Sequence, residues 1–216
     1  MKEYDLSKRE NLSIFFKDYL KKIEAKSEFK KIEDAIYFAK EKHAGQVRKG
    51  NGIPYINHPV EVAILASHMT TEVETIIAAV LHDTLEDTDT TYEEIKNKFG
   101  KKVAELVLSD SEDKRNYMSR EASWKLRKED TINKAKTASK QEKIILLCDK
   151  LSNLRQTKED FDVIGDKVWE KFNQKDKKMH GWYHKELLKS FSELKDYPEY
   201  KAVSYTHLTL PTKRIV

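Results

Sequence analysis

The dipeptide His82-Asp83 ends a strongly apolar segment within residues 73–89, and two more carboxylates, Glu86 and Asp87, follow closely. An imidazole nitrogen and a carboxylate oxygen held side by side suit a hard or borderline divalent ion such as manganese, zinc or iron. A helix end whose polar residues face water would produce the same short pattern. The segment predicts one half of a metal site, and the other half must come from elsewhere in the chain.

Two further residues, His58 and Asp149, are candidates for that other half. His58 follows a loop that carries the adjacent cations Arg48 and Lys49, and the alternative is a helix cap or a surface histidine. Asp149 interrupts an apolar helical run, where a buried carboxylate needs a cation or several hydrogen-bond donors, so a structural salt bridge is the alternative. With the His-Asp pair they supply two imidazoles and two carboxylates, which describes a catalytic metal centre better than a structural one.

The elements that must position these residues are predicted to be helices. Apolar residues recur at helical spacing in residues 12–23, 32–39, 73–81 and 144–151. Thr91 and Ser139 each precede a glutamate by three positions, which is the spacing of a capping box, and Gly45 and Gly100 are placed to end helices. We also expect Asn57 or His58 to cap the helix that contains Pro59. The pattern predicts an all-α fold, a bundle of roughly eight to ten helices.

The composition excludes several classes of protein. The 216 residues include 6 glycines, 4 prolines and 1 cysteine, with a net charge of +4 that is spread along the chain. No basic stripe for nucleic acid, no internal disulfide and no apolar run long enough for a membrane span is found. Cys148 is expected in the core, and His180 and His184 are expected on the surface or in packing. We expect a cytoplasmic protein with a small anionic substrate.

The domain organisation is predicted in three parts. We expect residues 1–28 to form an N-terminal helix that packs on the domain and residues 29–200 to form the catalytic domain. We expect residues 204–216 to be a non-native tail, because they lose both the Lys/Glu richness and the helical periodicity. Residues 109–119 are polar and aperiodic and predict a mobile surface loop.

Three blocks of the sequence resemble the hydrolase domain of the RelA/SpoT alarmone enzymes, which belongs to the HD-domain metal-dependent phosphohydrolases, and in particular its single-domain form, the small alarmone hydrolases. The blocks are His43-Ala44-Gly45-Gln46-Val47-Arg48-Lys49 with Pro54-Tyr55-Ile56-Asn57-His58-Pro59, then His82-Asp83-Thr84-Leu85-Glu86-Asp87-Thr88, then Asp149-Lys150-Leu151-Ser152-Asn153-Leu154-Arg155. They occur in order over roughly residues 29–157, and as a set they are specific. The loop between Lys49 and Pro54 is longer than in the bifunctional enzymes, and no synthetase activity is expected.

The resemblance implies a role for each matched residue. The metal ligands fall on His58, His82, Asp83 and Asp149, with one divalent ion, most often Mn²⁺. The acidic pair falls on Glu86 and Asp87, and the contacts to the nucleotide fall on Arg48, Lys49, Tyr55 and Asn153. The implied reaction is hydrolysis of the 3′-diphosphate of ppGpp or pppGpp by a metal-activated water, with no nucleic-acid or membrane partner.

Other functions remain open on the sequence alone. Another HD-type nucleotide or dinucleotide phosphohydrolase would use the same metal residues on a different phosphate ester. A non-catalytic nucleotide sensor would have no use for the acidic pair. Binding of nucleic acid through the lysine-rich helices is the weakest of the alternatives.

Overall fold

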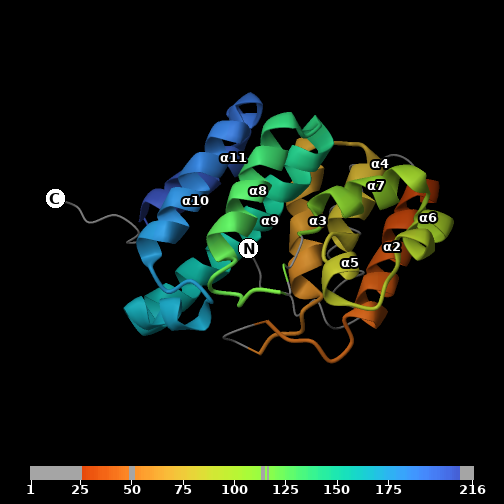
Figure 1. The fold of residues 1–216 in the computed structure, drawn as a ribbon. Coiled ribbons are helices and arrows are strands. Elements are labelled where there is room, and N and C mark those ends of the chain that lie inside the picture. The colour runs from red at the N-terminus through yellow and green to blue at the C-terminus, as the bar shows by residue number, and fades with distance from the viewer. Residues whose placement is uncertain (1–25, 49–51, 113–114, 116, 210–216) are drawn as a thin grey trace. The chain divides into compact units, whose positions relative to one another are not determined.

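The computed structural model describes residues 26–48, 52–112, 115 and 117–209. Within these residues the regular structure consists of α-helices and short 3₁₀ helices, with an isolated bridge between Val47 and Pro54. The all-α prediction is confirmed. The chain divides into two compact units, Met1–Ser111 and Glu112–Val216, and Figure 1 shows the helices of each.

The first unit is built around a helix that is buried on almost every side. This helix, α4 (Val73–Leu81), packs against α2 (Lys26–Lys42), α3 (Asn57–Met69) and α7 (Lys101–Asp110). Only Glu74 on α4 escapes burial, and a helix that is apolar all round is stable only inside a core. The short helices α5 (Thr84–Asp87) and α6 (Tyr92–Phe99) follow it. The segment that introduces His82 is thus the core of its unit.

The helix ends in this unit follow local chemistry. Thr91 accepts a hydrogen bond from the Glu94 amide at 3.2 Å, and Gly100, at φ +96°, ends α6 as expected. The expected cap of α3 is wrong, because the residue before its first turn is Ile56 and no side chain caps it. The preceding turn already satisfies the amides of Asn57 and His58, which donate to the carbonyls of Pro54 and Tyr55.

The second unit contains α8 (Trp124–Thr137), α9 (Lys140–Ile164), the 3₁₀ helix η1 (Gly165–Lys171), α10 (Lys177–Ser190), the 3₁₀ helix η2 (Ser192–Leu194) and α11 (Pro198–Thr209). Its long helix α9 packs on α11 and η1, while α10 packs on α8 and α11. The predicted capping box at the start of α9 is confirmed, since Ser139 and Glu142 bond to each other's backbone amides. Cys148 lies in the core as expected.

Two segments differ from expectation. Residues 109–119 are not a uniformly exposed loop, because α7 continues to Asp110 and the side chain of Glu112 is only 16% exposed. The loss of helical structure expected from residue 204 onward does not occur there, because α11 continues to Thr209. Whether residues 204–216 are native stays a prediction. The expected N-terminal helix lies mostly outside the described residues.

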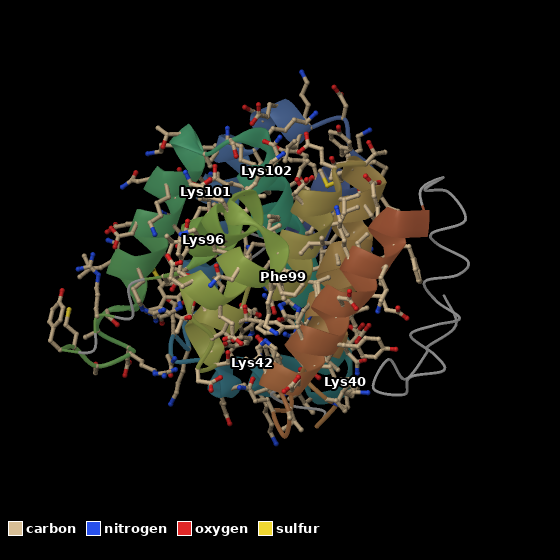
Figure 2. All side chains as sticks on the ribbon, turned by 90° about the vertical axis from the view of Figure 1, so that its right-hand side faces the viewer. Lys40, Lys42, Lys96, Phe99, Lys101 and Lys102 are labelled. Carbon is tan, nitrogen blue, oxygen red and sulfur yellow. The ribbon has the colours of Figure 1, made fainter. Side chains whose placement is uncertain are left out.

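The outer surface formed by α2, α6 and α7 carries many lysines (Figure 2). Most of the lysines labelled there are matched by carboxylates within 3.4 Å. The ion pairs are Lys42–Asp89, Lys96–Glu93, Lys101–Glu105 and Lys102–Glu72. Surface charge is therefore balanced locally on this side of the first unit. In the described part of the chain, no helix combines the length and the apolar character that crossing a bilayer requires.

Candidate metal centre and nucleotide site

His82 is placed by the buried helix α4, whose last residue precedes it. Its side chain is 1% exposed, and its Nδ1 donates a hydrogen bond to the carbonyl of Ala79 at 2.9 Å. A carbonyl oxygen can only accept, so Nδ1 carries the hydrogen and the lone pair of a neutral ring lies on Nε2. That Nε2 lies 3.0 Å from Oδ2 of Asp83. The helix end thus aims an imidazole lone pair at a carboxylate oxygen.

His58 enters the same place from the first turn of α3. It is 3% exposed, and its Nε2 lies 3.5 Å from the same oxygen, Oδ2 of Asp83. The rings of His58 and His82 meet edge to face with centroids 5.1 Å apart, and a nitrogen of each lies within 4.8 Å of the other. The structure therefore brings together the two histidines predicted from the sequence, although they lie on different helices.

Asp83 is the meeting point of these groups. It stands between α4 and α5, and its Oδ2 also accepts a hydrogen bond from the hydroxyl of Tyr55 at 2.6 Å. A lone pair on a neutral imidazole and a carboxylate oxygen repel each other at 3.0 Å unless a proton or a metal cation lies between them. Two imidazole nitrogens and a carboxylate oxygen also form a donor set that divalent transition ions accept. These residues fit a metal ion.

The acidic pair Glu86 and Asp87 lies on the single turn of α5, directly after Asp83. Glu86 is half-buried and Asp87 is exposed. The turn is fixed at both ends by hydrogen bonds: the amide of Asp87 donates to the carbonyl of Asp83 at 2.9 Å, and the side-chain amide of Gln46 donates to the carbonyl of Asp87 at 2.8 Å. The sequence analysis did not predict a role for Gln46. Its position next to the cationic loop was the one feature of the sequence that could have suggested such a role.

The cationic loop turns back on itself through backbone hydrogen bonds. The amide of Arg48 donates to the carbonyl of Ile53 at 2.8 Å, and the amide of Tyr55 donates to the carbonyl of Gln46 at 3.0 Å. The guanidinium of Arg48 lies 5.9 Å from the centre of the Tyr55 ring. Lys49, its predicted companion, lies outside the described residues. Tyr55, predicted as a wall of the nucleotide pocket, has its hydroxyl engaged with Asp83.

The second unit carries the remaining predicted residues, Asp149 and Asn153, on α9. Asp149 is 6% exposed, its Oδ2 pairs with the ammonium of Lys150, and its Oδ1 accepts from the side-chain amide of Asn153 at 2.5 Å. The salt bridge considered as the alternative for Asp149 is therefore present. Burial raises the pKa of the neighbouring Cys148 thiol, and the nearby carboxylates of Glu199 and Asp149 act in the same direction. Cys148 is a protonated core residue.

In this unit His180 lies among aromatic rings. The rings of Trp124, Trp169 and Phe172 surround His180 at centroid distances of 5.3, 5.2 and 5.0 Å. Burial lowers its pKa, against the effect of a hydrogen bond to the carbonyl of Gln174. The predicted packing role is confirmed for His180.

Comparisons with known proteins find a matching family model and several similar proteins. A family model described as HD domain matches residues 35–174. Among curated relatives, the MESH1 guanosine-3′,5′-bis(diphosphate) 3′-pyrophosphohydrolase of Danio rerio is 44% identical over 125 residues, which cover 56% of this chain and 66% of the relative. The MESH1 enzyme of Mus musculus is 41% identical over 133 residues, covering 60% of this chain and 70% of the relative. The guanosine-3′,5′-bis(diphosphate) 3′-pyrophosphohydrolase of Aquifex aeolicus is 62% identical over 76 residues, covering 35% of this chain and 11% of the relative.

Solved structures show the same fold. A protein described as a metazoan ortholog of SpoT that hydrolyzes ppGpp matches with a TM-score of 0.67 at 24% identity, covering 85% of this chain and 97% of the other. A crystal structure of a Listeria monocytogenes protein matches with a TM-score of 0.61 at 28% identity, covering 69% and 96%. The chain spans less than two thirds of the Aquifex and Danio relatives. The family model covers more than half of the chain, on both sides of the boundary between its two units. The chain belongs to the HD domain family.

Proposed function

We propose that this chain hydrolyses the 3′-diphosphate of ppGpp or pppGpp, releasing GDP or GTP and pyrophosphate. The observation that carries the proposal is the convergence of His58 and His82 on one oxygen of Asp83, in a chain whose relatives are named for this reaction. HD domain membership implies a divalent metal ion. We propose that the ion is Mn²⁺ and that the reaction takes place in the cytoplasm, with a guanine nucleotide as the partner.

His58, His82, Asp83 and Asp149 would hold the ion in this proposal. Asp149 is included because it is a buried carboxylate that matches the last block of the family pattern. A bound divalent ion supplies a lowered pKa to coordinated water and offsets negative charge on a phosphoryl oxygen. The hydrogen bond that Nδ1 of His82 donates to the carbonyl of Ala79 would keep the ring in the tautomer that presents Nε2.

Glu86 and Asp87 would accept and return the proton of the attacking water. A positioned carboxylate in such a role contributes roughly 10²–10⁴-fold to the rate. The exposure of Asp87 leaves its carboxylate accessible to solvent, while Glu86 is half-buried. Either residue can therefore exchange protons with a water, and single substitutions to Gln and Asn identify which of them matters.

Arg48 and Lys49 would bind the diphosphates. Arg48 does so through its planar fork of donors and Lys49 as a point charge. Tyr55 has its hydroxyl on Asp83, so its ring edge rather than its hydroxyl would line the nucleotide pocket. Asn153 donates one amide hydrogen to Asp149 and would contact the ribose.

Product analysis tests the proposal. The protein is incubated with Mn²⁺ and, separately, with ppGpp, GTP, GMP and a dinucleotide, with and without chelator, and products are separated by anion-exchange chromatography. We expect GDP and pyrophosphate from ppGpp, no turnover with chelator, and slower turnover of the other nucleotides. Faster turnover of a mononucleotide than of ppGpp would assign the chain to another HD phosphohydrolase. Binding of ppGpp without any turnover would make it a sensor.

A further inference from the structure

The end of α2 brings two side chains, His43 and Gln46, into contact. The helix ends at Lys42, and Gly45 takes the left-handed conformation at φ +78°, which turns the chain back on the helix end. Nδ1 of His43 then lies 2.8 Å from Oε1 of Gln46. Figure 2 shows this end of α2 through the labelled Lys40 and Lys42. His43 is 3% exposed.

The direction of the hydrogen bonds shows which ring nitrogen of His43 carries a hydrogen. The carbonyl of Asp87 only accepts, so the group of Gln46 that lies 2.8 Å from it is the amide nitrogen. The oxygen of Gln46 must then face His43, and an oxygen acceptor requires that Nδ1 of His43 carries a hydrogen. Two hydrogen bonds thus connect the His43 ring to the Gln46 amide and the Gln46 amide to the backbone of Asp87. Asp87 lies 41 residues after Gln46 in the chain.

The same imidazole supports the other end of the acidic turn. Its ring packs on the ring of Tyr55 with centroids 4.9 Å apart and planes at 39°. The hydroxyl of Tyr55 donates to Oδ2 of Asp83 at 2.6 Å. His43 therefore contacts both side chains that hold the segment from Asp83 to Asp87, Tyr55 at its start and Gln46 at its end.

We propose that His43, as the Nδ1–H tautomer, is a positioning residue for the acidic turn of residues 83–87. It orients the Gln46 amide, which fixes the Asp87 backbone, and it supports the Tyr55 ring, which fixes Asp83. The expected effect of His43 on ppGpp hydrolysis rests on the proposed function, whereas its expected effect on the conformation of residues 83–87 does not. A ring used only to fill space would be replaced by phenylalanine without loss, and this difference makes the proposal testable.

The test compares variants that keep or remove the Nδ1 donor. His43→Asn places an amide NH₂ where Nδ1–H stands, His43→Gln places it nearer to Nε2, and His43→Phe keeps the ring without any donor. His68→Phe is the matched control, because His68 is exposed at the end of α3. Hydrogen–deuterium exchange of the peptide spanning residues 84–90 reports on the turn in the metal-free protein, and circular dichroism checks that each variant is folded.

We expect exchange of that peptide to become about tenfold faster in His43→Phe and His43→Gln, the net worth of one hydrogen bond. His43→Asn should stay within about threefold of the parent chain, and His68→Phe should not differ from it. The ppGpp kcat should fall roughly 10–100-fold in His43→Phe, with KM nearly unchanged, and His43→Asn should restore most of it. Gln46→Met should behave like His43→Phe, and the double variant should lose no more than either single one.

Two results would overturn the proposal. The first is unchanged exchange in a folded His43→Phe variant, which would leave His43 a packing residue. The second is equal loss in His43→Asn and His43→Phe, which would show that the Nδ1 donor is not what matters. If the parent chain fails to hydrolyse ppGpp, the proposed function is refuted while the exchange experiment still decides the role of His43.

Discussion

The buried carboxylate of Glu112 allows a direct test of how a charged side chain contributes to the free energy of unfolding. One of its oxygens accepts from Arg127 at 2.8 Å, and the other accepts from Lys128 at 2.6 Å and from the Thr131 hydroxyl at 3.2 Å. Burial by itself raises the pKa of this carboxyl, but the charge and hydrogen bond of Lys128, with the charges of Lys150 and Arg127, outweigh it. The pKa falls from its ordinary 4.5 to about 2.

The magnitude follows from linkage between protonation and folding. Each pKa unit is worth about 1.4 kcal/mol, so ionised Glu112 favours the folded state by about 3 kcal/mol over the protonated side chain. Its pKa is lower in the folded than in the unfolded chain, so this contribution is present above pH 4.5 and is lost as the pH falls toward about 2. Glu112→Gln has the shape of the protonated form and should lose the whole contribution at pH 7.

Urea unfolding of the parent chain and of Glu112→Gln, followed by circular dichroism from pH 7 to pH 2.5, measures this contribution. The difference in unfolding free energy should be about 3 kcal/mol at pH 7 and should shrink steadily below pH 4.5. Asp162→Asn is the control in the same unit, because Asp162 pairs with Lys158 but is 58% exposed, and it should cost less than about 1 kcal/mol. A difference for Glu112→Gln that is small at pH 7, or that does not change with pH, would refute the reasoning.

Three further substitutions test the site and the helix ends. Asp83→Asn removes the charge on which the two histidines converge, so calorimetry should show Mn²⁺ binding weakened by more than about 10-fold, and unchanged affinity would exclude Asp83 as a ligand. Tyr55→Phe removes the donor to Asp83 and should weaken Mn²⁺ binding by roughly 10–100-fold with an unchanged circular dichroism spectrum; equal affinity would show that the hydroxyl has no role in the site. Ser139→Ala breaks the capping box of α9 and should lower the unfolding free energy by about 1 kcal/mol in urea, where no change would contradict the assigned cap.

What the sequence predicted well are features that depend on neighbours in the chain. The cap at Ser139 and the glycine stops at Gly45 and Gly100 use residues within one helical turn, so spacing alone identifies them. The burial of α4 follows from its apolar residues, which are continuous over residues 76–81. Local signals of this kind also gave the all-α fold.

What the sequence did not predict depends on contacts between distant residues. Glu112 was predicted to lie in a mobile loop, because its hydrogen-bond partners are 15 to 19 residues away and no local sequence pattern indicates them. The expected cap at Asn57 failed because carbonyls in the preceding turn already bind the first amides. Gln46 stands beside the cationic loop in the sequence, but its hydrogen bond to Asp87 joins residues 41 positions apart, which spacing does not reveal.

The burial of the polar groups at the end of α4 would favour the binding of the proposed cation there. His82 is 2% exposed and His58 is 3% exposed, so water does not solvate the Nε2 atoms that lie 3.0 and 3.5 Å from Oδ2 of Asp83. The hydrogen of His82 is committed to Ala79, and the hydroxyl of Tyr55 already occupies Asp83. A proton between His82 and Asp83 would remove the repulsion for one imidazole only, whereas a divalent ion would bind both imidazole nitrogens and the carboxylate oxygen at once. The apolar packing of α4 thus holds these donors together at the cost of burying them, and the proposed metal ion would offset that cost.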